Sequence, residues 1–192
     1  MSLLPRSSDR ATRGGGFVGG FVGVFLLLLA CGGPDANSPG RALPPYTGHT
    51  TELFDDVIEP RAVGMNLEES VQPRTDPTLR ERTQTGDGVV KVRVETVTGS
   101  GDGETVKYEL TLRVLASLAG QHPPQDTLTV FVDKSSPSIG ILKSFDTRLG
   151  GKTFVAFVRE FQTGEDRRFH FHFAPDTKDV AAAVKEAVDL SE

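Results

Sequence analysis

Two histidines near the carboxyl end of the chain stand at a spacing that could serve metal chemistry. His170 and His172 alternate with three phenylalanines, so in an extended strand they lie on one face. Two histidines supply two ligand positions, whereas a zinc site needs a third or fourth ligand. His49 and His122 show no relation in spacing to the pair. We therefore predict a solvent-facing pair opposite the phenylalanines, with no metal and no cofactor.

The carboxylates give less specific signals. Adjacent Asp55 and Asp56 could act as acid and base, but their geometry would depend on tertiary structure, and neighbouring carboxylates in a loop are usually solvated. Asp102 and Glu104 around Gly103 resemble the start of a calcium loop, but the alternating ligand spacing stops there. A hairpin turn is the simpler interpretation of that segment.

Motifs for nucleophilic catalysis and phosphate binding are missing from the sequence. It contains no G-x-S-x-G motif for a serine nucleophile. Gly99, Gly101 and Gly103 form a glycine-rich stretch, but no Lys-Ser or Lys-Thr follows it, as a phosphate loop requires. Cys31 is the only cysteine, so the chain cannot form an internal disulfide. No catalytic residue is assigned, and we favour a protein that is not an enzyme.

The single cysteine follows an uncharged apolar run, residues 17–30, which comes after a polar and net positive segment. The run is shorter than the about 20 residues of a spanning helix and suits a signal-peptide core. The sequence Leu28-Leu29-Ala30-Cys31 resembles the lipobox of bacterial lipoproteins. The resemblance covers only this part of the chain, and it implies cleavage between Ala30 and Cys31 and a diacylglyceryl thioether on Cys31. The alternative is a plain secretory signal with an incidental cysteine.

Stable anchoring takes at least two acyl chains, and the implied modification, which palmitate labelling would reveal, supplies two or three. In envelopes of the enteric type an Asp after the cysteine retains a lipoprotein in the inner membrane, so Gly32 favours the outer membrane and the periplasm. Residues 32–48 are rich in Gly, Pro, Ser and Asn and predict a flexible tether. The expected organisation is a signal peptide (1–30), a lipidated cysteine and tether (31–48), and one globular domain (49–192).

The overall composition fits one folded domain with an acidic surface. Hydrophobic residues make up 37% of the chain, which is enough for a core at this length. The formal net charge is −5, whereas a nucleic-acid-binding protein usually shows a basic surface. We therefore expect no nucleic-acid partner.

Alternation of apolar and polar residues predicts five strands. They lie near residues 89–98, 106–118, 127–133, 153–161 and 168–174. The second is the clearest, because Leu112 lies in the middle of seven alternating apolar residues and should face the core, with Thr111 and Arg113 facing outward. Apolar residues at helical spacing predict helices near 137–148 and 178–190.

Other segments allow more than one interpretation. Residues 51–58 could form a short helix or an edge strand. Asp76 followed by Pro77 is typical of a helix N-terminus. Phe131 and Phe161 could lie on the outward faces of their strands and form a small contact patch, or the terminal helix could cover them.

The order of elements predicts a mainly β fold with helices, of the α+β type. We expect either a five-stranded antiparallel OB-like barrel or a curled sheet, with a helix between strands three and four and a C-terminal helix. From Val89 to Phe161 the layout resembles netrin-type variants of the OB barrel. This resemblance implies no function, because such barrels serve many functions. An open antiparallel sheet with a helix on one face also fits.

These observations favour a non-enzymatic envelope lipoprotein, held to the membrane through acylated Cys31, whose domain binds a protein or glycan partner. The alternatives are a hydrolytic enzyme with a carboxylate-based site and a structural component of the envelope. A concave pocket with two or more convergent carboxylates would favour the enzyme. A flat apolar patch would favour partner binding.

Overall fold

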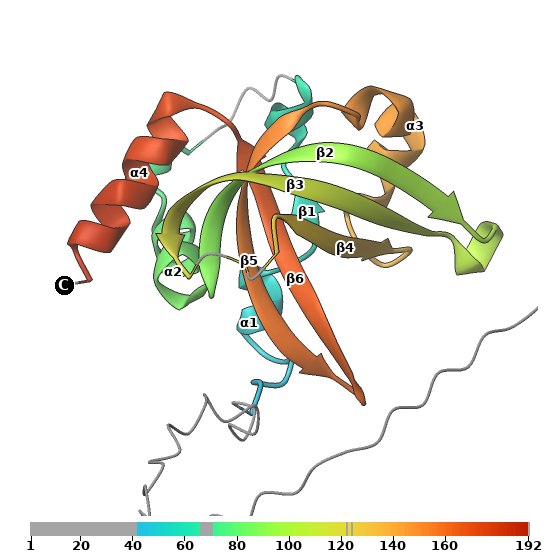
Figure 1. The fold of residues 1–192 in the computed structure, drawn as a ribbon, viewed down its shortest axis with the longest axis horizontal. Helices are drawn as coiled ribbons and strands as arrows, with labels where there is room; N and C mark the ends of the chain where they lie inside the picture. The colour runs from blue at the N-terminus through green and yellow to red at the C-terminus, as the bar shows by residue number, and fades with distance from the viewer. Residues whose placement is uncertain (1–41, 66–70, 122, 124, 192) are drawn as a thin grey trace, which may run out of the picture. The chain divides into compact units, whose positions relative to one another are not determined.

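The five predicted strands and one further strand form a single curled sheet with the shape of a half-barrel (Figure 1). The computed structural model describes residues 42–65, 71–121, 123 and 125–191. Its strands are β1 (Val57–Ile58), β2 (Gly88–Ser100), β3 (Lys107–Gly120), β4 (Thr127–Asp133), β5 (Thr153–Thr163) and β6 (Asp166–Pro175). Its α-helices are α1 (Thr50–Leu53), α2 (Pro77–Thr85), α3 (Ile139–Leu149) and α4 (Lys178–Asp189). The described residues belong to one compact unit, Arg41–Glu192.

The predicted fold class is confirmed, but the five-stranded, wholly antiparallel sheet is wrong. Across the sheet the strand order is β1-β6-β5-β2-β3-β4. β1 adds a sixth strand that runs parallel to β6 and pairs Val57 with His172. Because β1 precedes the others in the chain, α3 follows the fourth strand and not the third. Two residues are too short a strand for alternation to reveal.

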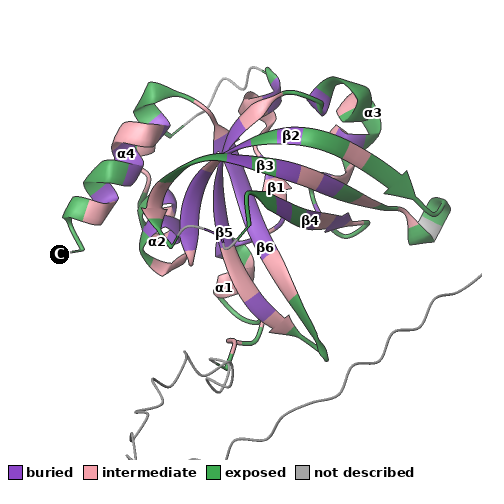
Figure 2. Ribbon diagram, in the orientation of Figure 1, coloured by how far each residue is buried: buried purple, intermediate pink, exposed green. Residues whose placement is uncertain are grey.

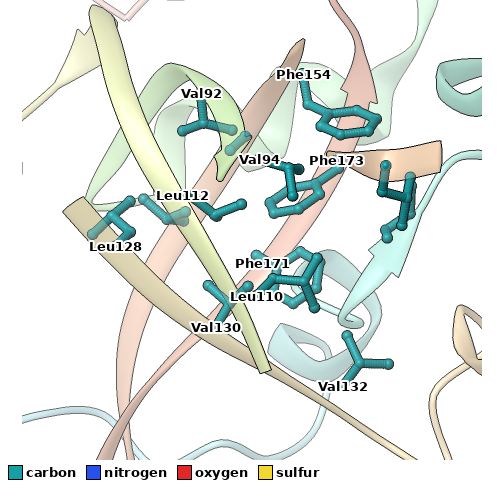
Figure 3. Close-up of a cluster of buried hydrophobic side chains, with 14 of the residues drawn as sticks. Val92, Val94, Leu110, Leu112, Leu128, Val130, Val132, Phe154, Phe171 and Phe173 are labelled. Carbon is teal, nitrogen blue, oxygen red and sulfur yellow. The ribbon is translucent and has the colours of Figure 1, made fainter. Parts of the chain in front are cut away.

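The concave face of the half-barrel carries the larger hydrophobic core (Figure 3). Alternate residues of β2 to β6 build it, and Leu142 and Leu149 of α3 pack against it. Leu112 is fully buried there, whereas Thr111 is half-buried and Arg113 is exposed. The predicted orientation at the centre of this strand is therefore confirmed.

The apolar stripe of β3 does not stay on one face along the whole strand. Register shifts in the β2–β3 pairing leave Leu115 and Leu118 without pairing partners on β2. Ala116, between the two bulges, is exposed. Leu118 packs against the second core, on the opposite face of the sheet. The prediction that seven apolar residues share one face is wrong past Val114, because each extra residue in a bulge shifts the alternation.

The second core covers the convex face of the sheet, between β5 and the helices α2 and α4. Phe157 of β5 and Val184 of α4 are both buried in it. Phe161 is fully buried here, so it forms no surface patch. Its ring contacts Tyr46 and Phe54 of the N-terminal segment, the ring of His170 and the guanidinium of Arg159.

Helices α2 and α4 begin where the sequence predicts, and α3 begins two residues later than predicted, at Ile139. The Asp76 side chain accepts a hydrogen bond from the N–H of Thr78 at the start of α2. Thr177 caps α4 in the same way, by accepting from the N–H of Val180. Among the described residues, no helix has both the length and the apolar character needed to cross a membrane.

Arg168 joins the two sides of the half-barrel by its side chain. Its guanidinium donates to the carboxylate of Asp133 at 2.9 Å and to the backbone oxygen of Phe131 at 3.0 Å, both on β4. It also lies over the ring of Phe131, 5.5 Å from the centroid. Phe131 is therefore half-buried beneath a cation, and it does not stand alone on the surface.

Candidate functional site

The two histidines of β6 are buried on the convex face of the sheet. His170 is 3% exposed and His172 is 5% exposed. Figure 2 shows burial concentrated in the halves of β5 and β6 that lie away from the hairpin joining them. The prediction that these histidines face solvent is wrong. They lie beneath a segment that precedes them by more than a hundred residues, and local alternation carries no information about such a segment.

His170 lies at the centre of a polar network. Its Nδ1 is 2.9 Å from Oδ2 of Asp56, whose Oδ1 accepts from the N–H of Phe171. The ring of Tyr46 stacks on the imidazole, with centroids 3.4 Å apart. Its Nε2 lies 3.4 Å from the hydroxyl of Thr163. A neutral imidazole meets these contacts by donating to Asp56 and accepting from Thr163.

His172 lies between two carboxylates. Its Nδ1 is 2.9 Å from Oδ1 of Asp55, and its Nε2 is 3.2 Å from Oε1 of Glu59. Ionised carboxylates only accept hydrogen bonds, so only the protonated imidazolium can donate to both. Arg82 of α2 lies 3.8 Å from the other oxygen of Asp55. Adjacent aspartates that we expected to be solvated thus hold two neighbouring histidines of one strand.

The electrostatics of this cluster differ from one group to the next. Burial alone would lower the pKa of His172, but hydrogen bonds with Asp55 and Glu59 hold it above its ordinary 6.5. Burial raises the pKa of Asp56 despite its hydrogen bond with His170. Burial would also raise the pKa of Glu59, but the hydrogen bond from His172 keeps it below 4.5.

The other histidines and the calcium-like segment do not join this cluster. His49 is exposed and bonds Glu52 and Glu81, while His122 lies outside the described residues. Asp102 begins a tight turn that its hydrogen bonds with Thr105 close, as the hairpin interpretation predicts. The side chain of Glu104, and both Ala30 and Cys31, also lie outside what the structure describes. Within the described ranges, no three or more His, Cys, Asp and Glu side chains are grouped to hold a metal ion.

A chain of contacts joins a hydroxyl, an imidazole and a carboxylate, in the order found in nucleophilic triads. Its members are Thr163, His170 and Asp56. Thr163 is exposed at the end of β5, and the 3.4 Å contact is long for an activated hydroxyl. The cavity described next does not include Thr163 in its lining. No local sequence pattern indicates this arrangement, because its members are far apart in the chain.

A cavity of about 240 Å³ opens at one end of the half-barrel. Apolar walls come from Val158 of β5, Phe169 of β6 and Pro123 of the β3–β4 connection. Leu43 and Pro44 form a further wall from the amino-terminal side of the chain. With Asp87 and Gly88 at the start of β2, the cavity joins segments from five parts of the sequence.

Three polar side chains of the cavity lining, Asp87, Glu160 and Arg167, have hydrogen-bond partners. Arg167 donates two hydrogen bonds to the carboxylate of Glu160, at 3.1 and 2.9 Å. Asp87 accepts from the backbone N–H of Glu160 at 2.8 Å. Two carboxylates thus line one concave site, and each already has a donor. Paired groups can still offer further donors and acceptors to a ligand, because each keeps unused hydrogen-bonding positions.

The last residues of the predicted tether belong to this site. The backbone oxygen of Pro44 accepts from the N–H of Gln162 at 2.9 Å, and Pro45 forms a parallel bridge with the same residue. The hydroxyl of Tyr46 donates to the backbone oxygen of Phe54. Residues 44–46 thus lie along a part of β5 that β2 does not reach.

Comparison with models of known protein families gives no match. A search of curated proteins finds no significant relative. The functional assignment therefore depends on the residues and their geometry.

Proposed function

We propose that this chain is an exported lipoprotein of the bacterial envelope, whose domain binds a protein or glycan partner. Cys31 carries the lipid, and the protein lies in the outer membrane and faces the periplasm. The lipobox-like sequence ending at Cys31 supports the anchor. The observation that carries the binding role is the cavity at the end of the half-barrel, with its apolar walls and paired polar groups.

The size of the cavity indicates what it holds. At about 240 Å³ it is smaller than pockets that enclose a drug-sized ligand, which start at about 300 Å³. It suits one group that projects from a larger partner, such as a peptide side chain or one sugar ring. The ring of Phe169 and the Arg167–Glu160 pair would contact the apolar and polar parts of that group.

Site-directed photocrosslinking in the full-length, membrane-attached protein tests this role. A photoreactive phenylalanine at Phe169 should give a light-dependent adduct with one partner. The same group at Leu115, which is exposed on β3 and outside the cavity lining, is the matched control. Equal adducts from both positions, or none from Phe169, would contradict binding in this cavity.

The anchor has its own test. Replacing Cys31 by Ser should abolish palmitate labelling and release the protein from membranes, because the thiol is the acceptor of the lipid. The Ser variant differs by one atom, so an effect on folding is not expected. Labelling that survives in the Cys31→Ser chain would contradict the lipoprotein assignment.

Hydrolysis is the second candidate function, because Asp87 and Glu160 line the same concave site. The pairing of Glu160 with Arg167 favours binding, because both carboxylate oxygens already accept hydrogen bonds from the guanidinium. If the partner isolated by crosslinking is a glycan, incubation with purified protein separates the two roles. Cleavage that Glu160→Gln abolishes would establish the enzyme, and unchanged glycan would support a binding protein.

A further inference from the structure

The N-terminal segment, residues 42–63, contacts β5 at Pro44 and Pro45 and pairs with β6 through β1, and it is called the strap below. Its backbone is tied to β6 by N–H donors of Asp56 and Glu59, each 2.9 Å from a carbonyl oxygen, of Phe171 and Phe173 respectively. Leu53 and Phe54 of the strap are buried in the convex core. The histidine–carboxylate cluster lies directly beneath this segment.

We infer that this cluster is a pH-dependent clasp, in which His172 is the titrating group that holds the strap on β6. Every hydrogen bond of the two imidazoles, other than that with Thr163, goes to a strap carboxylate. This inference is independent of what the cavity binds.

The groups around the clasp come from three elements. They are Tyr46, Asp55, Asp56, Glu59 and Arg61 of the strap, Arg82 of α2, and Arg168 and His170 of β6. The arginines are charged at every pH of interest. The carboxylates of Asp55 and Glu59 therefore face one switchable cation, which is His172.

The geometry explains why His172 and not His170 controls the strap. Neutral His170 can satisfy both of its contacts, since Thr163 can donate as well as accept. Neutral His172 has one N–H, so either Asp55 or Glu59 loses its hydrogen bond from the imidazole and faces a lone pair. The two carboxylates of the strap then remain half-buried, and β6 no longer donates to both of them.

The direction of the effect follows from linkage. A histidine whose pKa is raised in the folded state contributes stability that is complete below the ordinary value of 6.5 and is lost as pH rises through the folded pKa. Glu59, with its lowered pKa, contributes stability above 4.5 that is lost as pH falls through its folded pKa. Burial raises the pKa of Asp56, so this group also loses stabilisation as pH rises, in the same direction as His172. The strap therefore loosens as the medium becomes alkaline.

Amide hydrogen exchange of the full chain, corrected for the intrinsic effect of pH, measures strap release at Asp56 and Glu59. In the wild type, both amides should exchange faster as pH rises through the titration of His172, which its ring NMR signals report. In Glu59→Gln the side-chain amide can donate to neutral His172, so this acceleration should disappear. Glu52→Gln, which changes an exposed partner of His49, should behave like the wild type.

Three results bear on the clasp. If His172 titrates at or below 6.5 in the wild type, the inference is overturned. If Glu59→Gln shows the same alkaline acceleration as the wild type, His172 does not act through Glu59 and the inference also fails. If Glu59→Gln does not fold, the wild type alone tests the inference, because exchange at Asp56 must follow the titration of His172. Exchange at Asp56 that does not follow this titration overturns the inference.

Discussion

The two faces of the sheet are stabilised in different ways. Phe171 and Phe173 point to the concave face, where every side chain of the core cluster is apolar. His170 and His172, their neighbours in β6, point to the convex face and meet Asp55, Asp56 and Glu59. One face of β6 therefore contributes to an apolar core whose stability does not depend on pH. The other face contributes to a network of ionisable groups. Stability and pH response can be changed separately in such a strand.

The largest effect is expected on the concave face. Leu112→Ala should lower the free energy of unfolding by about 2–5 kcal/mol, because it leaves a cavity at a fully buried position. Thr111→Ala, on the neighbouring residue, should stay within about 0.5 kcal/mol. Urea denaturation measures both, and equal losses would show that Leu112 does not face a packed core.

On the convex face, Asp56→Ala should cost about 2–3 kcal/mol. The change removes the acceptor of two buried donors, the His170 ring and the N–H of Phe171. It also places alanine at a φ of 54°, a left-handed conformation that Asp tolerates better. Asp189→Ala, at an exposed helix end, is the control and should be nearly neutral. A neutral Asp56→Ala would mean that the cluster does not contribute to stability.

The comparison of faces also predicts a dependence on pH. The free energy of unfolding of the wild type should decrease as pH rises from 6.5 through the folded pKa of His172, because the charged imidazolium is the form that the fold stabilises. The loss caused by Leu112→Ala should be the same at both ends of that range. A Leu112→Ala effect that changes with pH would show that the two faces are coupled.

The smallest effect concerns the rim of the convex face. Asp76→Ala removes the N-cap of α2, which covers that face, and should cost about 1 kcal/mol. Thr78→Ala, which keeps the backbone donor of the same bond, should cost less. Thermal unfolding measures the decrease in Tm of both variants. An equal decrease would contradict a stabilising role of the Asp76 side chain as the N-cap.

The sequence predicts the concave face better than the convex face, for a physical reason. Strand alternation correctly predicts that Leu112 faces the core, because alternation is a local property of the chain. Alternation assigns Leu118 to the wrong face, because a bulge can be predicted only when the pairing with the partner strand is known. The burial of His170 and His172 depends on Asp56 and Asp55, which lie 114 and 117 residues away and leave no periodic signal in β6. The cavity likewise joins residues whose proximity only the folded chain creates.

The contact of Pro44 with Gln162 gives the chain a mechanical property. In a protein held at Cys31, any tension would enter the folded domain through residues 42–46. The first contacts to take that force are the Pro44–Gln162 hydrogen bond and the bridge at Pro45, and both lie beside the cavity wall formed by Leu43 and Pro44. Stretching the tether would thus pull this wall away from Phe169 before the sheet itself is strained.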